Sequence, residues 1–252
     1  MCRDCGCSIT EVDSGEESHS HQKGHSHIHD NPQLNDAKTI SVIQKILDKN
    51  DKEAEHNRKH LESSAVLGIN LMSSPGSGKT TLLEYLAEVA EFKFGVIEGD
   101  LETNRDASRL QAKGIDAIQI QTGSACHLDA FMVHKALHKL SLDKIDICFI
   151  ENVGNLVCPA SYDVGTHLNI VLVSIPEGQD KIIKYPVMFR QADLILITKT
   201  DLLPYFNYDI AQEREEARRL KPSVDILEIN INDIDSIKAV ANWIEFKRKM
   251  RG

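Results

Sequence analysis

The sequence predicts an α/β fold in which a mainly parallel sheet is flanked by helices on both faces. From residue 66 onward, short runs rich in valine, isoleucine and leucine alternate with stretches of helical periodicity. These runs are mostly apolar, which is typical of strands buried on both faces. The first run also passes through a glycine-rich loop directly into a helical stretch. Together these observations indicate strand–helix–strand units and a parallel sheet.

The N-terminal elements differ from the rest. Residues 1–35 hold three cysteines, five histidines and few large apolar side chains, so we expect a flexible, metal-binding tail. Asp36 is a candidate N-cap, and Ile40, Ile43 and Leu47 follow it at helical spacing. The pattern predicts a linker helix over residues 36–62. A single domain should then occupy residues 63–252.

Seven buried strands are expected within this domain. They are predicted at residues 66–72, 95–98, 117–121, 145–150, 170–175, 194–198 and 226–231. Helical spacing is found over residues 80–90 and again around residues 128–140. Right-handed crossovers between parallel strands place all their carboxyl ends at one edge of the sheet. The loops that follow the strands should therefore lie together, at the edge where ligands bind.

Composition and charge exclude several classes of protein. The formal net charge is −9 and no basic block is present, which argues against nucleic-acid binding. No run of eighteen apolar residues suggests a transmembrane helix, and no secretion signal follows the N-terminus. We expect a cytoplasmic protein that binds neither nucleic acid nor membrane. In a reducing cytosol its cysteines are metal ligands or free thiols, and Cys148, within an apolar strand, is expected to be inert.

The most specific motif is a phosphate-binding loop. Residues 73–80 read Ser-Ser-Pro-Gly-Ser-Gly-Lys-Thr, the pattern Gly-x4-Gly-Lys-Ser/Thr with Ser73 in place of the first glycine. Lys79 can span the β- and γ-phosphates, and the Thr80 hydroxyl can ligate Mg²⁺. The alternative, an ordinary glycine-rich turn, is disfavoured by the strand before the loop and the helix after it. The nucleotide-binding residues expected here are Ser74, Pro75, Gly76, Ser77, Gly78, Lys79, Thr80 and Thr81.

Two further strand ends supply groups that hydrolysis needs. Glu151 closes one strand with a carboxylate for Mg²⁺, and Gly154 offers a backbone N–H to the γ-phosphate. Asp100 ends another strand, where it could hold a Mg²⁺-bound water or orient the attacking water; the alternative is a helix N-cap. The predicted catalytic set is therefore Lys79, Asp100, Glu151 and Gly154. The predicted Mg²⁺ ligands are Thr80, Asp100 and Glu151.

Residues 198–201 are the candidate for base recognition. They read Thr-Lys-Thr-Asp where guanine-binding proteins have Asn-Lys-x-Asp. The Asp201 carboxylate can accept two hydrogen bonds from guanine donors that adenine lacks, whereas Thr198 loses the amide contact of asparagine. We therefore favour GTP over ATP, with Lys199 and Asp201 as base contacts.

Two clusters of metal ligands lie in the tail. Cys2, Cys5 and Cys7 place three thiols within six residues, a spacing that can wrap one soft or borderline ion such as nickel or zinc. A histidine tract follows, with irregular spacing that argues against a purification tag. Its imidazoles should bind Ni²⁺ or Zn²⁺ weakly, as a store. These histidines are His19, His21, His25, His27 and His29.

A third cluster is discontinuous. Cys126 and His127 open a predicted helix, and Cys158 follows Gly154 by four residues. Both loops belong to the edge that carries the nucleotide, so the three ligands should meet in an incomplete site that a homodimer could complete. The alternative is that both cysteines are ordinary loop thiols. Five other histidines are expected to be isolated surface or helix-face residues: His56, His60, His134, His138 and His167.

Taken together, these motifs resemble the HypB family. The resemblance extends over essentially the whole chain, from Cys-x-x-Cys-Gly-Cys and the histidine tract through the phosphate loop, Glu-Gly-Asp, Gly-Ser-Ala-Cys-His-Leu-Asp and Glu-Asn-Val-Gly-Asn-Leu-Val-Cys-Pro-Ala. It implies a GTP-hydrolysing nickel metallochaperone for maturation of nickel–iron hydrogenases, with the fold of the dimerising SIMIBI class of P-loop proteins. It also implies a tight nickel site at Cys2, Cys5 and Cys7, and a nickel/zinc site at Cys126, His127 and Cys158. The implied partners are a GTP-dependent second copy, a HypA-type nickel chaperone and the hydrogenase large-subunit precursor.

This resemblance leads to a hypothesis of coupling. Because Cys158 lies in the segment that follows Gly154, loss of the γ-phosphate should move a metal ligand and release nickel. Turnover in isolation should be slow, since no arginine finger can be assigned. The last guanine-contact loop, expected near residues 230–233, lacks a recognisable signature. The rival interpretations are a urease-type nickel-insertion GTPase and a nickel-storage protein with a regulatory nucleotide site.

Overall fold

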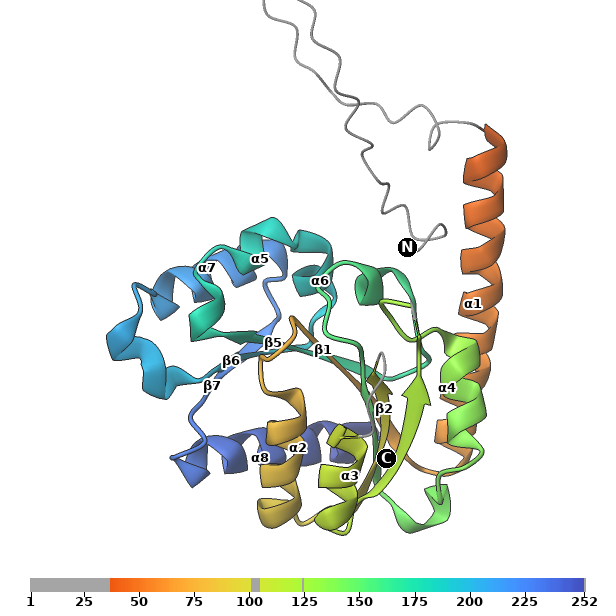
Figure 1. The fold of residues 1–252 in the computed structure, drawn as a ribbon, viewed down its shortest axis with the longest axis horizontal. Coiled ribbons are helices and arrows are strands. Elements are labelled where there is room, and N and C mark those ends of the chain that lie inside the picture. The colour runs from red at the N-terminus through yellow and green to blue at the C-terminus, as the bar shows by residue number, and fades with distance from the viewer. Residues whose placement is uncertain (1–36, 101–104, 124, 252) are drawn as a thin grey trace, which may run out of the picture.

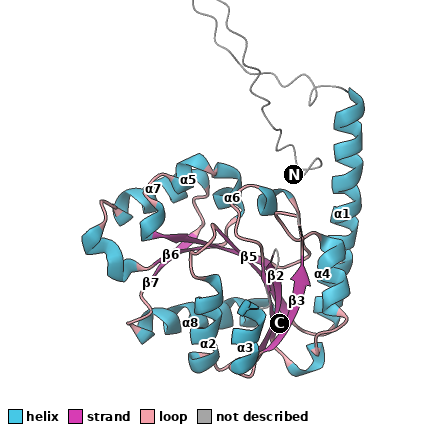
Figure 2. Cartoon of the chain, in the orientation of Figure 1, coloured by secondary structure: helices cyan, strands magenta, loops and turns pink. Residues whose placement is uncertain are grey.

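A seven-stranded, entirely parallel sheet forms the centre of the protein (Figures 1 and 2). The structure, a computed structural model, describes residues 37–100, 105–123 and 125–251. The strands are β1 (Leu67–Ser73), β2 (Phe94–Asp100), β3 (Asp116–Gln121), β4 (Ile147–Glu151), β5 (Leu168–Ser174), β6 (Leu194–Thr198) and β7 (Asp225–Ile229). Their order is β3-β2-β4-β1-β5-β6-β7. Each strand predicted from sequence is present, so the predicted fold class is confirmed.

Helices cover both faces of this sheet (Figure 1). They are α1 (Ala37–Ser63), α2 (Lys79–Val89), α3 (Arg105–Ala112), α4 (Ala130–Leu137), α5 (Lys181–Lys184), α6 (Pro186–Gln191), α7 (Ile210–Leu220) and α8 (Ile234–Arg251). The helices α2, α3 and α8 pack on one face, and α1, α4 and α5–α7 on the other. Within the described part of the chain, no helix combines the length and apolar character needed to cross a membrane.

The core is built by alternation along each strand. On β4, Phe149 joins the cluster under α2, α3 and α8, whereas Cys148 and Ile150 join the cluster under α1 and α4. The Phe94 and Phe149 rings meet edge to face at 5.2 Å between centroids. Burial raises the pKa of the Cys148 thiol to about 12. Cys148 is therefore a buried, unreactive thiol, as predicted.

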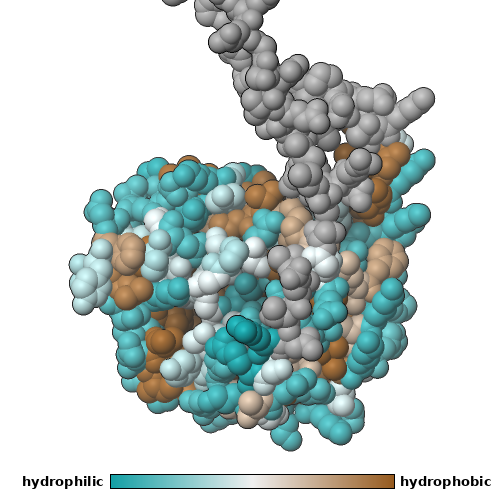
Figure 3. All heavy atoms as spheres, viewed as in Figure 1, coloured by the Kyte–Doolittle hydropathy of each residue, from teal (hydrophilic) through white to brown (hydrophobic). Residues whose placement is uncertain are grey.

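The C-terminal half of α1 is part of this packing. The buried Asn57 side chain donates hydrogen bonds to the carbonyl oxygens of Ala130 and Val164, at 2.8 and 3.2 Å. The first turns of α1 instead carry the exposed Ile40 and Val42. Figure 3 shows brown, hydrophobic surface at the upper right of the molecule, the side on which α1 lies in Figure 1. The limits 1–35, 36–62 and 63–252 for tail, helix and domain stay predictions.

The sheet order brings particular strand ends together. β1 lies between β4 and β5. Strands β2–β4 lie on one side of β1 and β5–β7 on the other, so the direction in which the chain adds strands reverses here. Such a reversal opens a crevice at the carboxyl ends of the neighbouring strands. Lys79 begins α2 after the loop that follows β1, and Asp100 is the last residue of β2, whereas Gly154 and Lys199 lie in the segments after β4 and β6. The fold therefore collects the predicted site residues at one edge.

A buried carboxyl group on α7 gives a first testable prediction. Glu213 is 0% exposed, and neither of its carboxylate oxygens has a hydrogen-bond partner among the described residues. Burial, and then the nearby Glu216, raise the pKa of Glu213 to about 8. The folded protein thus keeps a proton that the unfolded chain loses near pH 4.5, and its stability falls as pH rises towards 8. The free energy of unfolding of Glu213→Gln should exceed that of the wild type by roughly 1–3 kcal/mol above pH 8. At pH 4 the two free energies of unfolding should be about equal.

Urea unfolding across this pH range checks the prediction. Glu215→Gln is the matched control, because Glu215 lies on the same helix with its side chain 65% exposed. The control should follow the wild-type profile. A Glu213→Gln profile that also runs parallel to the wild type would contradict the assignment of this titration to Glu213.

Candidate nucleotide and metal site

The phosphate-binding loop is preformed between β1 and α2. Gly76 and Gly78 adopt φ values of 74° and 99°, a region that side chains disfavour. Gly78 is the N-cap of α2, and no side chain caps the first turn of that helix. The N–H groups of this turn are therefore open to an external acceptor. The backbone and the helix dipole together form an anion-binding site.

Residues at the end of β6 form hydrogen bonds with this loop. The Thr198 hydroxyl donates a hydrogen bond to the Ser77 carbonyl oxygen at 2.7 Å, and the Lys199 ammonium donates to the Gly76 carbonyl oxygen, also at 2.7 Å. The Ser77 hydroxyl lies 2.6 Å from a carboxylate oxygen of Glu177. Thr198, which replaces the asparagine of the guanine motif, thus has a role in holding the phosphate loop. The sequence pattern alone did not indicate that role.

Lys79 is buried beneath the loop. Its ammonium group donates a hydrogen bond to the Ser73 hydroxyl at 3.0 Å. Burial lowers the pKa of Lys79, and the charge of Glu151 opposes this shift. Ser73 occupies the position where the general motif has glycine, and here its side chain positions the lysine that faces the phosphates.

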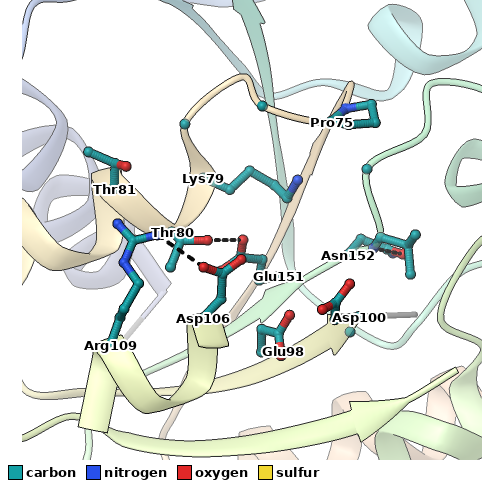
Figure 4. Close-up of a pocket in the computed structure, with 15 residues that line it drawn as sticks. Pro75, Lys79, Thr80, Thr81, Glu98, Asp100, Asp106, Arg109, Glu151 and Asn152 are labelled. Atoms are coloured by element: carbon teal, nitrogen blue, oxygen red, sulfur yellow. Dashed lines mark hydrogen bonds and ion pairs between the residues drawn. The ribbon is translucent and has the colours of Figure 1, made fainter. Parts of the chain in front are cut away.

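Carboxylates line the other side of the cavity (Figure 4). The Thr80 hydroxyl donates to Glu151 Oε1 at 2.7 Å, while the buried Glu151 Oε2 has no partner among the described residues. Burial raises the pKa of Glu151, and burial and then the charge of Glu151 raise that of Glu98 to about 8. An unpartnered buried carboxylate oxygen beside a hydroxyl fits a hard cation such as Mg²⁺, which prefers oxygen ligands. Asp100 and Glu98 face the same space.

The cavity has a volume of about 350 Å³ and is shared by three strand ends and α3. It includes four polar or charged side chains that the sequence patterns did not single out as site residues: Glu98, Asp106, Arg109 and Asn152. Arg109 is paired with Glu84 at 2.6 Å and with Asp106 at 3.0 Å. The helix carrying Arg109 matches no phosphate motif, so only the fold brings it to the cavity.

Some predicted nucleotide contacts lie beside the cavity instead of lining it. Lys199 and Ser77 hold the phosphate loop through the hydrogen bonds described above. Asp201 lies half-buried in a short 3-10 helix, Thr200–Tyr205, directly after β6. Because Lys199 contacts Gly76, this end of β6 lies next to the phosphate loop.

Gly154 is in direct contact with the phosphate loop. A Cβ atom at this position would lie 2.8 Å from both the Cα and the backbone nitrogen of Pro75. Real Cβ atoms do not approach backbone this closely. Only glycine allows the chain after β4 to approach the loop this closely, and both segments line the same cavity.

The three ligands predicted for a metal site in the domain lie together. The Cys126 and Cys158 sulfur atoms lie 2.7 Å apart, and His127 Nδ1 is 3.8 Å from the Cys126 sulfur. One ligand atom from each of these residues lies within 4.8 Å of the others. The His127 ring stacks on Tyr162 at 3.9 Å between centroids, and burial lowers the pKa of His127. Two thiols and a neutral imidazole are a donor set that suits zinc or nickel.

Two asparagines connect this cluster to the nucleotide cavity. Asn152, which lines the cavity, accepts a hydrogen bond from the Leu128 N–H at 3.1 Å through its side-chain oxygen. The Asn155 amide donates to the Cys126 carbonyl oxygen at 3.5 Å. Residues 151–158 therefore contact the phosphate loop at Gly154 and, through the two asparagines, the backbone of Cys126 and Leu128 on either side of His127. The sequence patterns did not identify either asparagine.

Other predicted ligands have different outcomes. The tail ligands lie outside the described residues: Cys2, Cys5, Cys7, His19, His21, His25, His27 and His29. The expectation that the remaining histidines are isolated is wrong for four of them. His56 and His60 on α1 meet His134 and His138 on α4.

Comparisons with known proteins agree with this geometry. The family described as "CobW/HypB/UreG, nucleotide-binding domain" matches residues 67–228. "Hydrogenase/urease maturation factor HypB" of Helicobacter hepaticus is 51% identical over 225 residues, covering 88% of this chain and 93% of the relative. The crystal structure of HypB from Helicobacter pylori in complex with nickel is 47% identical with a TM-score of 0.79, covering 81% of this chain and 96% of that one. HypB from Archaeoglobus fulgidus is 35% identical with a TM-score of 0.75, covering 80% and 100%. The chain therefore belongs to the HypB group of the CobW/HypB/UreG family of nucleotide-binding proteins.

Proposed function

We propose that this protein is a GTP-hydrolysing nickel metallochaperone that supplies nickel for maturation of nickel–iron hydrogenases. The observation that carries the proposal is the single segment, residues 151–158, that borders both the nucleotide cavity and the Cys126–His127–Cys158 cluster. Family membership supports it, because the relatives are named as maturation factors and one structure is described as a nickel complex. In this proposal the protein carries nickel as its cargo and hydrolyses GTP as its substrate.

The cavity residues have distinct roles in hydrolysis of GTP to GDP and phosphate. Lys79 and the N–H groups of the loop bind the phosphates, and the Gly154 N–H senses the terminal one. Thr80, Glu151 and Asp100 would hold Mg²⁺, which neutralises phosphate charge. Asp100 is placed to orient the attacking water. Arg109 is held in ion pairs with Glu84 and Asp106, so the isolated protein turns over slowly.

Asp201 should determine which base is bound. Its carboxylate accepts hydrogen bonds from the N1 and N2 groups of guanine, and an amide would present a donor to one of them. Asp201→Asn should therefore lower kcat/KM for GTP by about 100-fold or more and lose the preference for GTP over xanthosine triphosphate, since xanthine has a carbonyl where guanine has an amine. Competition between the two nucleotides in a phosphate-release assay measures this change. Unchanged selectivity would show that the base is read elsewhere.

The metal sites complete the proposal. Cys126, His127 and Cys158 bind nickel or zinc in the domain, while Cys2, Cys5 and Cys7 form a tight nickel site and the tail histidines a weak store. GTP promotes a homodimer, which supplies the remaining ligands of the domain site. Loss of the γ-phosphate frees Gly154, moves residues 151–158 and lowers the affinity for nickel. The recipients are a HypA-type nickel chaperone and the hydrogenase large-subunit precursor, in the cytoplasm.

Two alternatives can be separated by experiment. If the protein only stores nickel, the intact chain will bind nickel and release no phosphate from GTP. The Helicobacter hepaticus relative is named for both hydrogenase and urease maturation, so urease is a second candidate recipient. Nickel transfer to hydrogenase large-subunit precursor and to apo-urease, compared side by side with GTP present, distinguishes these recipients. Transfer to neither would contradict the delivery function.

A further inference from the structure

Five potential metal ligands gather between α1 and α4. We call Glu53, His56, His60, His134 and His138 the helix-pair cluster. The first three recur at helical spacing along α1, and His134 and His138 are four residues apart on α4, so each set lies on one face of its helix. The cluster contains none of the residues that line the nucleotide cavity and none of the Cys126–His127–Cys158 ligands.

The side chains of the cluster are in mutual contact. The Nε2 atoms of His134 and His138 are 3.1 Å apart. Glu53 Oε1 lies 3.1 Å from His134 Nδ1 and 3.8 Å from His56 Nδ1. The His56 and His134 rings stack at 5.1 Å, and the His60 and His138 rings are also 5.1 Å apart. One ligand atom each from Glu53, His56 and His134 lies within 4.8 Å of the others.

A buried amide fixes the tautomer of His134. Because Asn57 Nδ2 already donates to two carbonyl oxygens, its Oδ1 is the atom that faces His134 Nδ1, at 3.0 Å. An amide oxygen only accepts, so His134 Nδ1 carries the proton. In the neutral ring the lone pair is then on Nε2, which lies 3.1 Å from His138 Nε2. Metal-binding histidines are commonly oriented in this way, by a hydrogen bond from the second ring nitrogen.

The spacing fits two ligands of one ion. With metal–nitrogen bonds of about 2.0–2.1 Å, two ligands are about 2.9 Å apart at a right angle and about 3.3 Å apart at a tetrahedral angle. The observed 3.1 Å lies between these values.

We propose that the helix-pair cluster binds one divalent late transition-metal ion, Ni²⁺ or Zn²⁺, through Nε2 of His134 and of His138. His60, whose ring lies against that of His138, supplies a further ligand. Glu53, at 3.1 Å from His134 Nδ1, accepts from that N–H and helps to orient the ring. Imidazole nitrogens are ligands that such ions favour. The bound ion joins α1 to α4, the helix that begins directly after the Cys126–His127 segment. This site is additional to the proposed function and does not depend on nucleotide.

The test uses the full chain with Cys126→Ser/Cys158→Ser, which removes the thiol site. His134→Ala/His138→Ala is compared with Lys135→Ala/Lys139→Ala, a control in the same segment that removes two exposed side chains. Equilibrium dialysis against Zn²⁺ and, separately, Ni²⁺ should show one equivalent less metal in the histidine variant only. Whichever ion shows the difference is the one the cluster selects. Equal stoichiometry of the two variants for both ions would overturn the proposal.

Hydrogen exchange locates the bound ion. Added metal should slow amide exchange about 10-fold or more in peptides covering residues 50–62 and 130–139 of the parent and lysine control, and leave the histidine variant unchanged. If the double variant does not fold, His138→Gln serves instead, because His138 is exposed. It should lower affinity at this site at least about 10-fold. Exchange that does not respond to metal in any variant would show that the histidines only pack the helices. That result would leave the proposed GTP-linked delivery untouched.

Discussion

Lys79→Ala is expected to lower the kcat of GTP hydrolysis by about 100- to 1000-fold, the effect of removing one charged group from a preorganised phosphate site. The lysine is buried beside Ser73 with its ammonium group at the floor of the phosphate loop. No other described lysine lines the cavity, so the charge has no local replacement. Phosphate release under saturating GTP measures the loss. Nucleotide affinity should fall as well, since the same charge binds the ground-state phosphates.

Lys113→Ala is the matched control for this substitution. Lys113 is a surface lysine paired with Glu88 at 2.6 Å and lies outside the cavity. The Lys113→Ala variant should hydrolyse GTP at the wild-type rate. Both variants should still bind nickel at Cys126, His127 and Cys158, because neither change touches those ligands. Wild-type phosphate release by Lys79→Ala would contradict the assignment of this cavity as the hydrolytic site.

Gly154→Ala is expected to uncouple nucleotide from metal. The added methyl group would lie 2.8 Å from the backbone of Pro75, so residues 151–158 must move away from the phosphate loop. We expect at least about 100-fold slower hydrolysis, because the N–H that meets the terminal phosphate is displaced. Nickel release should also lose its dependence on the bound nucleotide. Stopped-flow transfer of nickel to a chelator, with GDP or a non-hydrolysable GTP analogue, measures the second effect.

Val157→Ala serves as the control for the loop. Val157 lies in the same segment and is 53% exposed. Shortening its side chain adds no atom that could press on Pro75, unlike the methyl group added at Gly154. Its hydrolysis and its nucleotide-dependent nickel release should match the wild type. If Gly154→Ala retains both properties, the contact between Gly154 and the phosphate loop is not the route of coupling.

The strands and the phosphate loop were predictable because their signals are local. The strands are short runs rich in valine, isoleucine and leucine, and the loop joins a strand to a helix through Gly76 and Gly78 in a fixed pattern. The parallel topology then placed Glu151 and Asp100 at the same edge by rule. The meeting of Cys126, His127 and Cys158 followed from the same rule, since both loops belong to that edge.

The features that were missed depend on contacts between distant segments. In the sequence, Asn152 is an ordinary polar residue. Only the structure shows that its side-chain oxygen accepts a hydrogen bond from the Leu128 N–H. The sequence shows Thr198 only as a replacement for the asparagine of the guanine motif. The structure shows that its hydroxyl donates a hydrogen bond to the Ser77 carbonyl oxygen. His56 and His134 are far apart in sequence, and only the packing of α1 on α4 stacks their rings. Sequence spacing carries no information on which faces of two helices will meet.

The most direct test of the coupling is the rate at which nickel leaves Cys126, His127 and Cys158. The full chain with Cys2→Ser/Cys5→Ser/Cys7→Ser removes the thiols of the tail, so that loss of the thiolate-to-nickel absorption reports the domain site alone. The protein is loaded with nickel, bound to GDP or to a non-hydrolysable GTP analogue, and mixed with excess chelator. We predict release at least about 10-fold faster with GDP, a difference of about 1.4 kcal/mol in barrier height. Equal release rates in the two nucleotide states would contradict the account.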